Sequence, residues 1–362
     1  MNIFLIETPL QLLNAIEAKN YFKLANNHLL VFVETTGYDS ELFKLLVCED
    51  DWDEVRFINL YNKKIEFKSK LLGHRISEKV QGWGYDYQQF LNRNKLDGIV
   101  HSFGRCKNIF LGNYLRDYIK YMRHFANTLE HEHLYILDDG TDALLINNER
   151  KDRSLRKDHT GGSGSYISRL KAKLRKSLIE WNDKDADKII FFTAYDMDVG
   201  YNDHLVRNEY KYLREKAASV VISDNVFFLG QPLVDDLYMK NEVYFDYLRK
   251  IKRYFADEKL VYIPHPRESV EIVGKIKEYL DLDIKRFNVP IEYEISIKGN
   301  KPKVLASFFC SALQNCKIIL DQQKIKAIYI PPEHLMRGHE LTQTAYEYFK
   351  KNANVNFEIV KL

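Results

Sequence analysis

The segment 261–269, VYIPHPRES, places a histidine between two prolines and beside an arginine, where a strand-forming run ends. The prolines restrict the backbone and exclude a helix, so we expect the His265 imidazole to be held at a strand end. Imidazole ordinarily titrates near neutral pH, and the Arg267 guanidinium favours anions. A lone histidine is more often structural, but these neighbours predict a proton donor to a phosphate leaving group.

Two adjacent aspartates end a strand-like run in the first half of the chain, in ILDDGTDAL (136–144). Two like charges a few ångströms apart do not both ionise easily, so either Asp138 or Asp139 could be a general base whose pKa is raised by its neighbour. An ordinary Asp-Asp-Gly turn has the same composition. The catalytic interpretation is favoured because His265 occupies the matching place in the second half.

Two further segments have residues suited to binding a nucleotide. In FFLGQPL (227–233) a glycine permits close approach of a ligand and a glutamine can recognise a polar edge. In LASFFCSAL (305–313) two serines precede a helix start, whose free N–H groups could hold a phosphate without a metal. A plain loop and a capped helix start predict the same residue types. The candidates are Gly230, Gln231, Pro232, Ser307 and Ser311.

A metal site is the weaker alternative. Asp196 and Asp198 follow a strand-like run, as the metal-binding DxD of a nucleotide-sugar transferase would, but alternating aspartates arise by chance in a chain this rich in acids. The four cysteines lack CxxC spacing, which makes a zinc site improbable and indicates reduced thiols in a cytoplasmic protein. These cysteines are Cys48, Cys106, Cys310 and Cys316.

Short β-rich runs alternate with helical patterns along the whole chain, as in parallel sheets with crossover helices. Thr8 and Pro9 predict the start of the first helix. The predicted strands of a first series are 3–7, 28–34, 54–60, 98–103 and 133–139, and those of a second are 189–195, 225–230, 259–265, 303–309 and 326–331. Two such series predict two Rossmann-like α/β domains with a cleft between them, with ligands outside the carboxyl ends of the strands.

We therefore expect a domain over 1–150, a basic connecting segment over 151–187 and a second domain over 188–362. Within the connection, the glycine- and serine-rich residues 161–165 resemble an engineered linker that replaces a loop. The basic residues over 150–176 predict a solvated helix face, or alternatively a peripheral contact with an anionic membrane.

Composition excludes several classes of protein. With 45% hydrophobic and 29% charged residues among 362, the chain is globular, and a net charge of +3 is too small to predict nucleic-acid binding. The apolar run Asn2 to Ile6 ends at Glu7, so we expect no secretory signal. No apolar run approaches the roughly 18 residues that a membrane span needs.

The order of these motifs resembles the bacterial sialyltransferases of glycosyltransferase family 52, of the lipooligosaccharide and capsule type. The strings that carry the resemblance are NIFLIETPLQLLNAIEA, ILDDGTDAL, FLGQPL, YIPHPRE, NVPIEYEI and SFFCSAL, between Asn2 and about Leu313. It implies a GT-B fold, CMP-sialic acid as donor, inversion at the anomeric centre, and no metal or other cofactor. A glycan acceptor would be the second substrate, and a homodimer is left open.

The resemblance also assigns roles to residues of this sequence. His265 would protonate or stabilise the departing CMP phosphate, and Glu292 would hold the ribose or cytosine. Pro266 would shape the base pocket, with Gly230 and Gln231 beside it, while Ser307 and Ser311 would bind phosphate. Pro232 and, because of its charge, Arg267 are also expected at the CMP site.

The chain departs from the family at the position of the base. Some relatives have an aspartate about two residues after the glycine of the LG-x-P segment, where this chain has Leu233 after Pro232. We therefore expect the base in the Asp138–Asp139 pair, with Asp235 and Asp236 in reserve. Alternative functions are transfer of another CMP-linked nonulosonate or Kdo-like acid, extension of a polysialic chain, and non-catalytic nucleotide or glycan binding.

Overall fold

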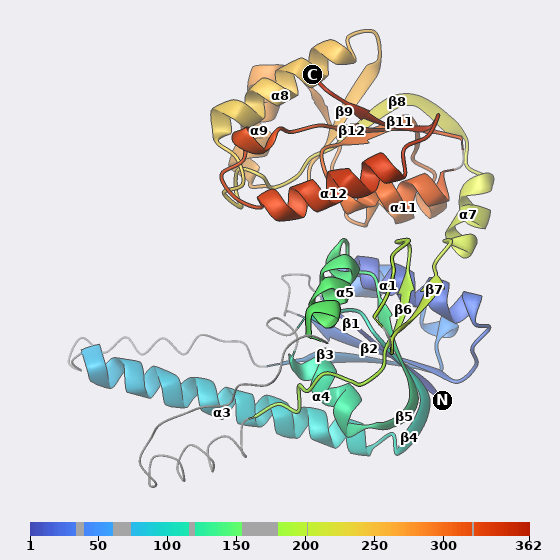
Figure 1. The fold of residues 1–362 in the computed structure, drawn as a ribbon, viewed down its shortest axis with the longest axis vertical. Helices are drawn as coiled ribbons and strands as arrows, with labels where there is room; N and C mark the ends of the chain where they lie inside the picture. The colour runs from blue at the N-terminus through green and yellow to red at the C-terminus, as the bar shows by residue number, and fades with distance from the viewer. Residues whose placement is uncertain (34–39, 61–73, 116–119, 154–179, 201, 321) are drawn as a thin grey trace. The chain divides into compact units, whose positions relative to one another are not determined.

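The structure, a computed structural model, describes residues 1–33, 40–60, 74–115, 120–153, 180–200, 202–320 and 322–362. The chain divides into two compact units, Met1–Arg207 and Asn208–Leu362. Each unit contains a single named sheet among its described residues, with helices packed against it (Figure 1).

The first unit has a seven-stranded sheet in the order β3-β2-β1-β4-β5-β6-β7, and every neighbouring pair is parallel. Its described elements are β1 (Asn2–Ile6), α1 (Pro9–Tyr21), β2 (Asn27–Val33), α2 (Ser40–Leu46), η1 (Glu49–Asp51), β3 (Glu54–Asn59), α3 (His74–His101), β4 (Arg105–Leu111), α4 (Lys120–Thr128), β5 (Glu130–Leu137), α5 (Asp142–Arg153), β6 (Ile190–Thr193) and β7 (His204–Arg207).

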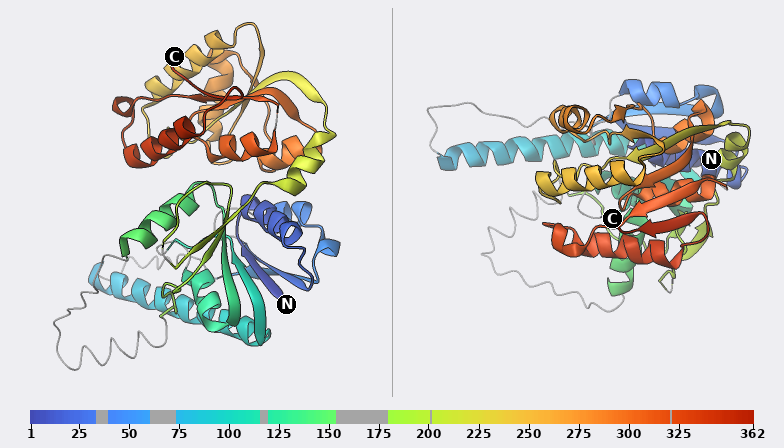
Figure 2. Two further views of the ribbon diagram at one scale, coloured as in Figure 1. Left: turned by 45° about the vertical axis from the view of Figure 1, so that its right-hand side comes forward. Right: turned by 90° about the horizontal axis from the view of Figure 1, so that it is seen from above.

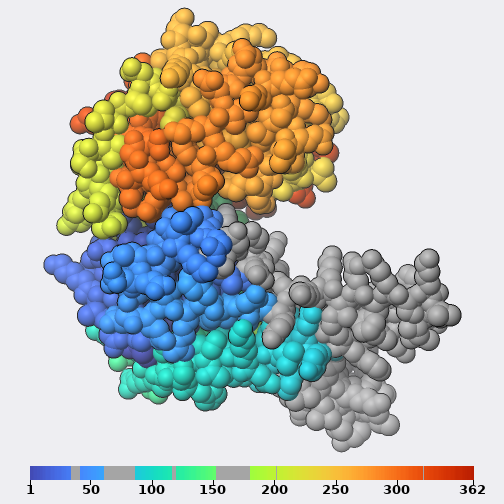
Figure 3. All heavy atoms as spheres, turned by 180° about the vertical axis from the view of Figure 1, so that it is seen from behind, coloured from blue at the N-terminus to red at the C-terminus, as the bar shows by residue number. Residues whose placement is uncertain are grey.

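The second unit has a six-stranded parallel sheet in the order β10-β9-β8-β11-β12-β13. Its described elements are α7 (Lys211–Ala218), β8 (Ile222–Leu229), α8 (Asn241–Tyr254), β9 (Lys259–Ile263), α9 (Val270–Leu280), β10 (Asp283–Ile284), α10 (Ile291–Tyr293), η2 (Glu294–Lys298), β11 (Lys301–Ser307), α11 (Ser311–Ile319), β12 (Lys324–Ile328), η3 (Pro332–His334), α12 (His339–Lys351) and β13 (Phe357–Val360). Helices α8 and α9 cover one face of this sheet, and α11 and α12 cover the other (Figures 1 and 2). Helix α7 packs on α11 and η2, and its yellow atoms lie against orange ones in Figure 3.

Local sequence explains how the first unit begins. All five residues of β1 are buried, as expected of a central strand of a parallel sheet. Thr8 then caps α1, because its side chain accepts a hydrogen bond from the Gln11 N–H, and Pro9 occupies the first turn. The predicted start of this helix is therefore confirmed.

In each sheet the strand order reverses at one place, between β1 and β4 and between β8 and β11. Ligands of open α/β sheets bind at the carboxyl ends of the strands beside such a reversal. The predicted α/β class with two Rossmann-like units, which are the components of a GT-B fold, is confirmed. The expected cleft between the units stays a prediction.

Two strand assignments from the sequence are wrong. Residues 98–103 are not a strand, because 98–101 form the last turn of α3, and the strand that follows is Arg105–Leu111. The run 189–195 does contain a strand, but this strand pairs with β5 in the first sheet, with Ile190 beside Tyr135. It is therefore not the first strand of the second sheet, as the sequence had predicted.

The domain limits at 150 and 188 are consequently wrong, and the division falls after Arg207. Besides β6, strand β7 also belongs to the first sheet, through its pairing with β6. An ion pair between Arg150 Nε and Asp203 Oδ2, at 2.7 Å, ties α5 to the segment before β7. Arg150 is thus engaged inside the first unit and is not a free surface cation.

Most of the connecting segment lies outside the described residues. The linker expected at 161–165 falls within 154–179, as does the larger part of the basic helix. The four cysteines are free thiols. Among the described helices, none combines the length and apolar character needed to cross a lipid bilayer.

Candidate active site

In the first unit, carboxylates and amides gather at the carboxyl ends of β1, β4 and β5. Strand β1 leads to Thr8 and Gln11 at the start of α1, strand β4 leads to Asn113, and strand β5 leads to the predicted aspartate pair. These are the strands on both sides of the sheet reversal, so the predicted ligand edge contains acidic side chains.

Asp139 is partly exposed and accepts hydrogen bonds from three side chains. Thr8 donates to its Oδ1 at 3.2 Å, and Gln11 and Asn113 donate to its Oδ2 at 2.8 and 3.2 Å. Burial raises the pKa of Asp139, and the three donors oppose that rise. The three donors therefore hold this carboxylate in a fixed orientation.

Asp138 has a different environment. Its side chain is buried, and its Oδ2 accepts the backbone N–H of Ala194, after β6, at 2.6 Å. Burial raises the pKa of Asp138 to about 7, and the charge of Asp139 is the smallest of the causes. The sequence analysis attributed a raised pKa in this pair to the neighbouring charge, but for Asp138 the main cause is burial. Asp138 links β5 to β6, so of the predicted pair Asp139 is the one placed to meet an acceptor.

Asp142 is an acidic residue to which the sequence analysis gave no role. It is the first residue of α5, and its Oδ2 accepts from the same Asn113 nitrogen at 3.0 Å. Burial raises the pKa of Asp142 to about 7, with the Asp139 charge as the next cause. A partly exposed carboxyl that titrates near neutral pH is a second candidate for the base.

The sequence contained part of the signal for this cluster. Gln11 lies in the first string of the family resemblance, which was quoted without a role for this side chain. Gly112 allows the glutamine to reach its place, because a Cβ at that position would overlap the Gln11 side chain. For Asn113 the sequence offered no signal, since the strand before it was placed wrongly.

In the second unit, His265 follows β9 as predicted and is partly exposed. Its Nδ1 accepts the backbone N–H of Arg267 at 3.1 Å, so the neutral ring carries its proton on Nε2. The expectation of a pKa near neutrality is wrong. Burial, and after it the Arg267 charge, lower the pKa of His265 to about 4, while the charge of Asp236 opposes this shift. At neutral pH the imidazole is therefore an uncharged donor through Nε2–H.

The loop after β8 meets the histidine segment. Asp235 Oδ2 accepts the backbone N–H of Ser269 at 3.0 Å, and Asp236 Oδ2 lies 2.9 Å from Arg267 Nη1. Both reserve candidates for the base are thus engaged with this segment. Gly230 and Pro232 are buried, whereas Pro266 and Arg267 are exposed.

Gln231 contributes a polar atom suited to a ligand. Its Oε1 is buried and has no hydrogen-bond partner among the described residues. A buried acceptor without a partner costs free energy, which a donor group on a ligand would recover. The prediction that this residue recognises a polar edge is compatible with this environment.

The predicted phosphate loop after β11 is divided between a buried and an accessible serine. Ser307 is buried, and its hydroxyl donates to the Leu229 carbonyl at 2.8 Å. Ser311 is the first residue of α11 and is partly exposed at the amino end of that helix. Of the two serines, Ser311 is the one placed to meet a phosphate.

Glu292 is buried, and its Oε1 accepts from Asn315 of α11 at 2.9 Å. Burial raises its pKa above the ordinary value. The aspartates of the metal-binding alternative follow β6 in the first unit, and the Asp198 carbonyl accepts from Asn147 at 2.7 Å. In the described part of the chain, no group of three or more histidine, cysteine, aspartate or glutamate residues could hold a metal ion.

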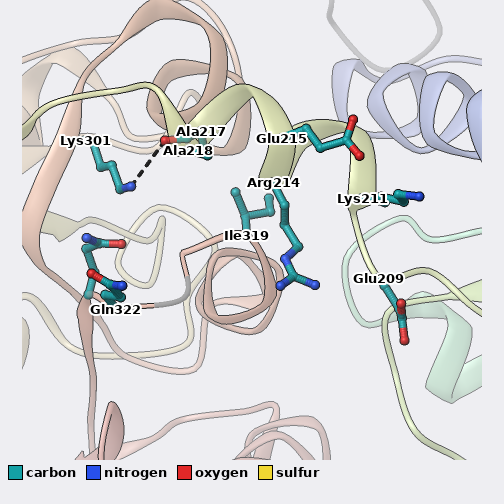
Figure 4. Close-up of a pocket in the computed structure, with 10 residues that line it drawn as sticks. Glu209, Lys211, Arg214, Glu215, Ala217, Ala218, Lys301, Ile319 and Gln322 are labelled. Atoms are coloured by element: carbon teal, nitrogen blue, oxygen red, sulfur yellow. Dashed lines mark hydrogen bonds between the residues drawn. The ribbon is translucent and has the colours of Figure 1, made fainter.

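A cavity of about 680 Å³ in the second unit lies away from these groups (Figure 4). It is lined by Lys301 at the start of β11, Ile319 at the end of α11 and Gln323 before β12, so it lies at the amino ends of the strands. The Lys301 ammonium donates to the Ala217 carbonyl at 3.2 Å. The cavity is not part of the candidate active site.

Comparison with solved structures found matches at low identity. A crystal structure of an α/β-galactoside α-2,3-sialyltransferase from the luminous marine bacterium Photobacterium phosphoreum is 14% identical, with a TM-score of 0.49, over 99% of this chain and 98% of that one. The GT-B domain of a sialyltransferase from Photobacterium damselae is 11% identical, with a TM-score of 0.47, over 100% of both chains. A heptosyltransferase of E. coli with ADP is 10% identical, with a TM-score of 0.39, over 97% of this chain and 98% of that one.

Comparison with curated proteins found no match. Comparison with protein families found glycosyltransferase family 52, over residues 59–330. That range covers well over half of the 362 residues and includes the Asp138–Asp139 pair, His265 and the start of α11. The chain therefore belongs to glycosyltransferase family 52.

Proposed function

We propose that this glycosyltransferase moves sialic acid from CMP-sialic acid to a hydroxyl of a galactose-type terminal sugar on a bacterial lipooligosaccharide or capsule. The reaction would invert the anomeric centre and need no metal. The observation that carries the proposal is the neutral His265 imidazole, with its proton on Nε2, at the carboxyl end of β9 in a chain of family 52.

Departure of CMP leaves negative charge on a phosphate, which fixed hydrogen-bond donors can stabilise. His265 Nε2–H, the amino end of α11 with Ser311, and the Arg267 guanidinium supply such donors in the second unit. The neutral His265 imidazole donates a hydrogen bond through Nε2–H to the departing phosphate and keeps its proton, and the negative charge that develops there strengthens this bond. These groups of the chain would stabilise the phosphate charge that a metal ion stabilises in other transferases.

The CMP moiety would contact the loop after β8. The unpartnered Gln231 Oε1 can accept from an amino or hydroxyl group, with Gly230, Pro232 and Pro266 around it. Glu292 would hold the ribose or cytosine after its buried carboxylate exchanges the Asn315 bond for a ligand hydroxyl. The Ser307 hydroxyl already donates to Leu229, so its direct role would be smaller than that of Ser311.

The acceptor hydroxyl must lose a proton as it attacks the sugar. Asp139, oriented by its three donors, is the proposed base. Asp142 shares the Asn113 amide and would set the pKa of the base through its charge. We further propose that the enzyme works in the cytoplasm at the inner membrane, where the basic residues over 150–176 other than the paired Arg150 would meet anionic headgroups. A homodimer stays a prediction.

One assay tests the proposal. Purified protein is incubated with CMP-sialic acid and a galactose-terminated acceptor in excess chelator, and release of CMP and the configuration of the product are followed. Acceptor-dependent CMP release with inversion is the expected result. Transfer only from another CMP-linked nonulosonate or a Kdo-like donor would change the donor class, and loss of activity in chelator would favour the metal-dependent alternative. Binding of CMP without turnover of any donor would leave a non-catalytic binding protein.

A further inference from the structure

A buried carboxylate lies directly beneath the histidine segment. Glu268 is 4% exposed, and its Oε2 accepts the backbone N–H of His265 at 2.6 Å. The backbone N–H of Glu268 in turn donates to the His265 carbonyl at 2.9 Å. The segment from His265 to Glu268 is thus a tight turn closed from both ends.

Two buried tyrosines hold the other oxygen of this carboxylate. Tyr262 of β9 donates to Glu268 Oε1 at 2.5 Å, and Tyr244 of α8 donates to it at 3.1 Å. The two hydroxyls lie 2.8 Å apart. Burial raises the pKa of both tyrosines, so their hydroxyls remain protonated donors. A strand and a helix therefore fix the carboxylate that fixes the turn.

We infer that Glu268 is the positioning residue of His265: its carboxylate, anchored by Tyr244 and Tyr262, fixes the His265 backbone and thereby the direction of Nε2–H. The inference rests on the proposed function, since it assigns His265 the contact with the leaving phosphate. Glu268 acts through the backbone, because the charges that shift the pKa of the imidazole come from Arg267 and Asp236.

Glu268 serves the turn as a hydrogen-bond acceptor, a role that does not require its charge. Burial raises the pKa of Glu268 to about 7, so its ionised form is disfavoured in the folded protein. The folded pKa lies above the unfolded one, and the contribution of Glu268 to stability is therefore lost as the pH rises through about 7.

The test compares Glu268→Ala with Glu268→Gln and with Glu271→Ala, which replaces an exposed glutamate of α9 that forms an ion pair with Lys275. Two quantities are measured: steady-state CMP release from CMP-sialic acid, and the pKa of the His265 imidazole by NMR of histidine-labelled protein without donor. The NMR measurement does not require activity. If wild-type protein releases no CMP, the proposed function fails while NMR still decides the role of Glu268.

We expect Glu268→Ala to lower kcat about 100-fold, with a change in donor KM of less than about threefold, because a misplaced donor is felt mainly in the transition state. The His265 pKa should rise from about 4 toward that of a hydrated imidazole as the turn loosens. Glu268→Gln should keep both values near wild type, since its amide oxygen can accept from His265 and the tyrosine hydroxyls can reverse.

Glu271→Ala should resemble wild type in both measurements. If Glu268→Ala fails to fold, Tyr262→Phe takes its place and should move kcat and the His265 pKa in the same directions, by less. A folded Glu268→Ala, or in its stead Tyr262→Phe, with wild-type kcat and an unchanged His265 pKa overturns the inference. So would a Glu268→Gln variant as impaired as Glu268→Ala.

Discussion

Asp139 and Asp142 share one hydrogen-bond donor, the side-chain nitrogen of Asn113, at 3.2 and 3.0 Å. The shared amide joins the end of β5 to the first residue of α5, so the two carboxylates cannot adjust independently. Each also raises the free energy of the other's ionised form. A donor between two such groups stabilises their charged states together.

Removal of this donor should change the pH dependence of transfer. Asn113 lowers the pKa of both carboxyls, so Asn113→Ala should raise these pKa values. Because the base must be ionised, activity rises with pH through its pKa, and the acidic limb of the profile of kcat/KM should move up by about one pH unit. Asn20→Ala, at an exposed asparagine of α1, is the control and should leave the limb in place. If the acidic limb does not move in Asn113→Ala, neither Asp139 nor Asp142 is the general base.

The two carboxylates should respond differently to neutralisation. Asp139→Asn removes the proposed base and should lower kcat about 10²- to 10⁴-fold with little change in donor KM. Asp142→Asn removes a like charge, which lowers the pKa of Asp139 and shifts the acidic limb downward while activity persists. Kinetics of both variants over a pH series distinguish the roles.

Other outcomes of that series would reassign the base. If Asp142→Asn and Asp139→Asn lower kcat equally, the two carboxylates act together as the base. Activity that survives in both but is abolished by Asp235→Asn or Asp236→Asn would move the base to the loop after β8. These last two residues already bind the histidine segment, so their replacement should also weaken that loop.

The histidine site could be predicted from the sequence because its determinants are local. Two prolines next to an imidazole fix a strand end whatever the rest of the fold does. The base cluster is different, since Gln11 and Asp139 are 128 positions apart and their contact exists only after β1 and β5 enter one sheet. Local patterns cannot report such a contact.

The errors in the fold have similar causes. The run 98–103 is apolar enough for a strand, but it continues the long helix α3. The strand after it, RCKNIFL, begins with polar residues that mask its period. Strand β6 was recognised as a strand, but its sheet was not, because pairing in a parallel sheet is decided by partners far away in the sequence.

Two replacements of His265 should distinguish the effect of its hydrogen bond on turnover from the effect of its side-chain volume. His265→Ala removes Nε2–H and should lower kcat about 10²- to 10⁴-fold, by far more than it weakens CMP binding. His265→Gln offers an amide N–H of similar reach and should recover part of that loss. Turnover and calorimetric CMP affinity are the measurements, with the exposed His204→Ala as control. Near-wild-type turnover of His265→Ala would show that His265 is not the donor that stabilises the leaving phosphate.

The buried Asp138 makes stability depend on pH. Its folded pKa of about 7 lies above the ordinary value, so its contribution to stability is fully present at low pH and is lost as the pH rises through about 7. Asp138→Asn stays neutral and keeps an oxygen for the Ala194 N–H. Thermal unfolding between about pH 6.5 and 8.5 should therefore show a smaller fall of the midpoint in Asp138→Asn than in wild type. The lowered pKa of His265 makes stability rise with pH below about 6.5, so the series starts at pH 6.5 to leave this opposite effect out.

That fall should become smaller without vanishing, because Asp142 and Glu268 have raised pKa values of about 7 as well. An unchanged slope in Asp138→Asn would mean that Asp138 is ionised in the folded protein at neutral pH.

Gly230 is required because its neighbours leave no room for a side chain. A Cβ at this position would overlap Tyr262 Oη and Glu268 Oε2, the groups that hold the histidine turn. Gly230→Ala should therefore lower the free energy of unfolding by about 1–3 kcal/mol, the usual cost of overpacking.

Gly274→Ala is the matched control, since its Cβ meets nothing within 4 Å on the exposed side of α9. It should stabilise the protein by about 1 kcal/mol through helix propensity. Urea unfolding of both variants measures the difference. Equal effects of the two substitutions would mean that the turn yields easily, in which case the packing beneath His265 is not rigid enough to direct its proton.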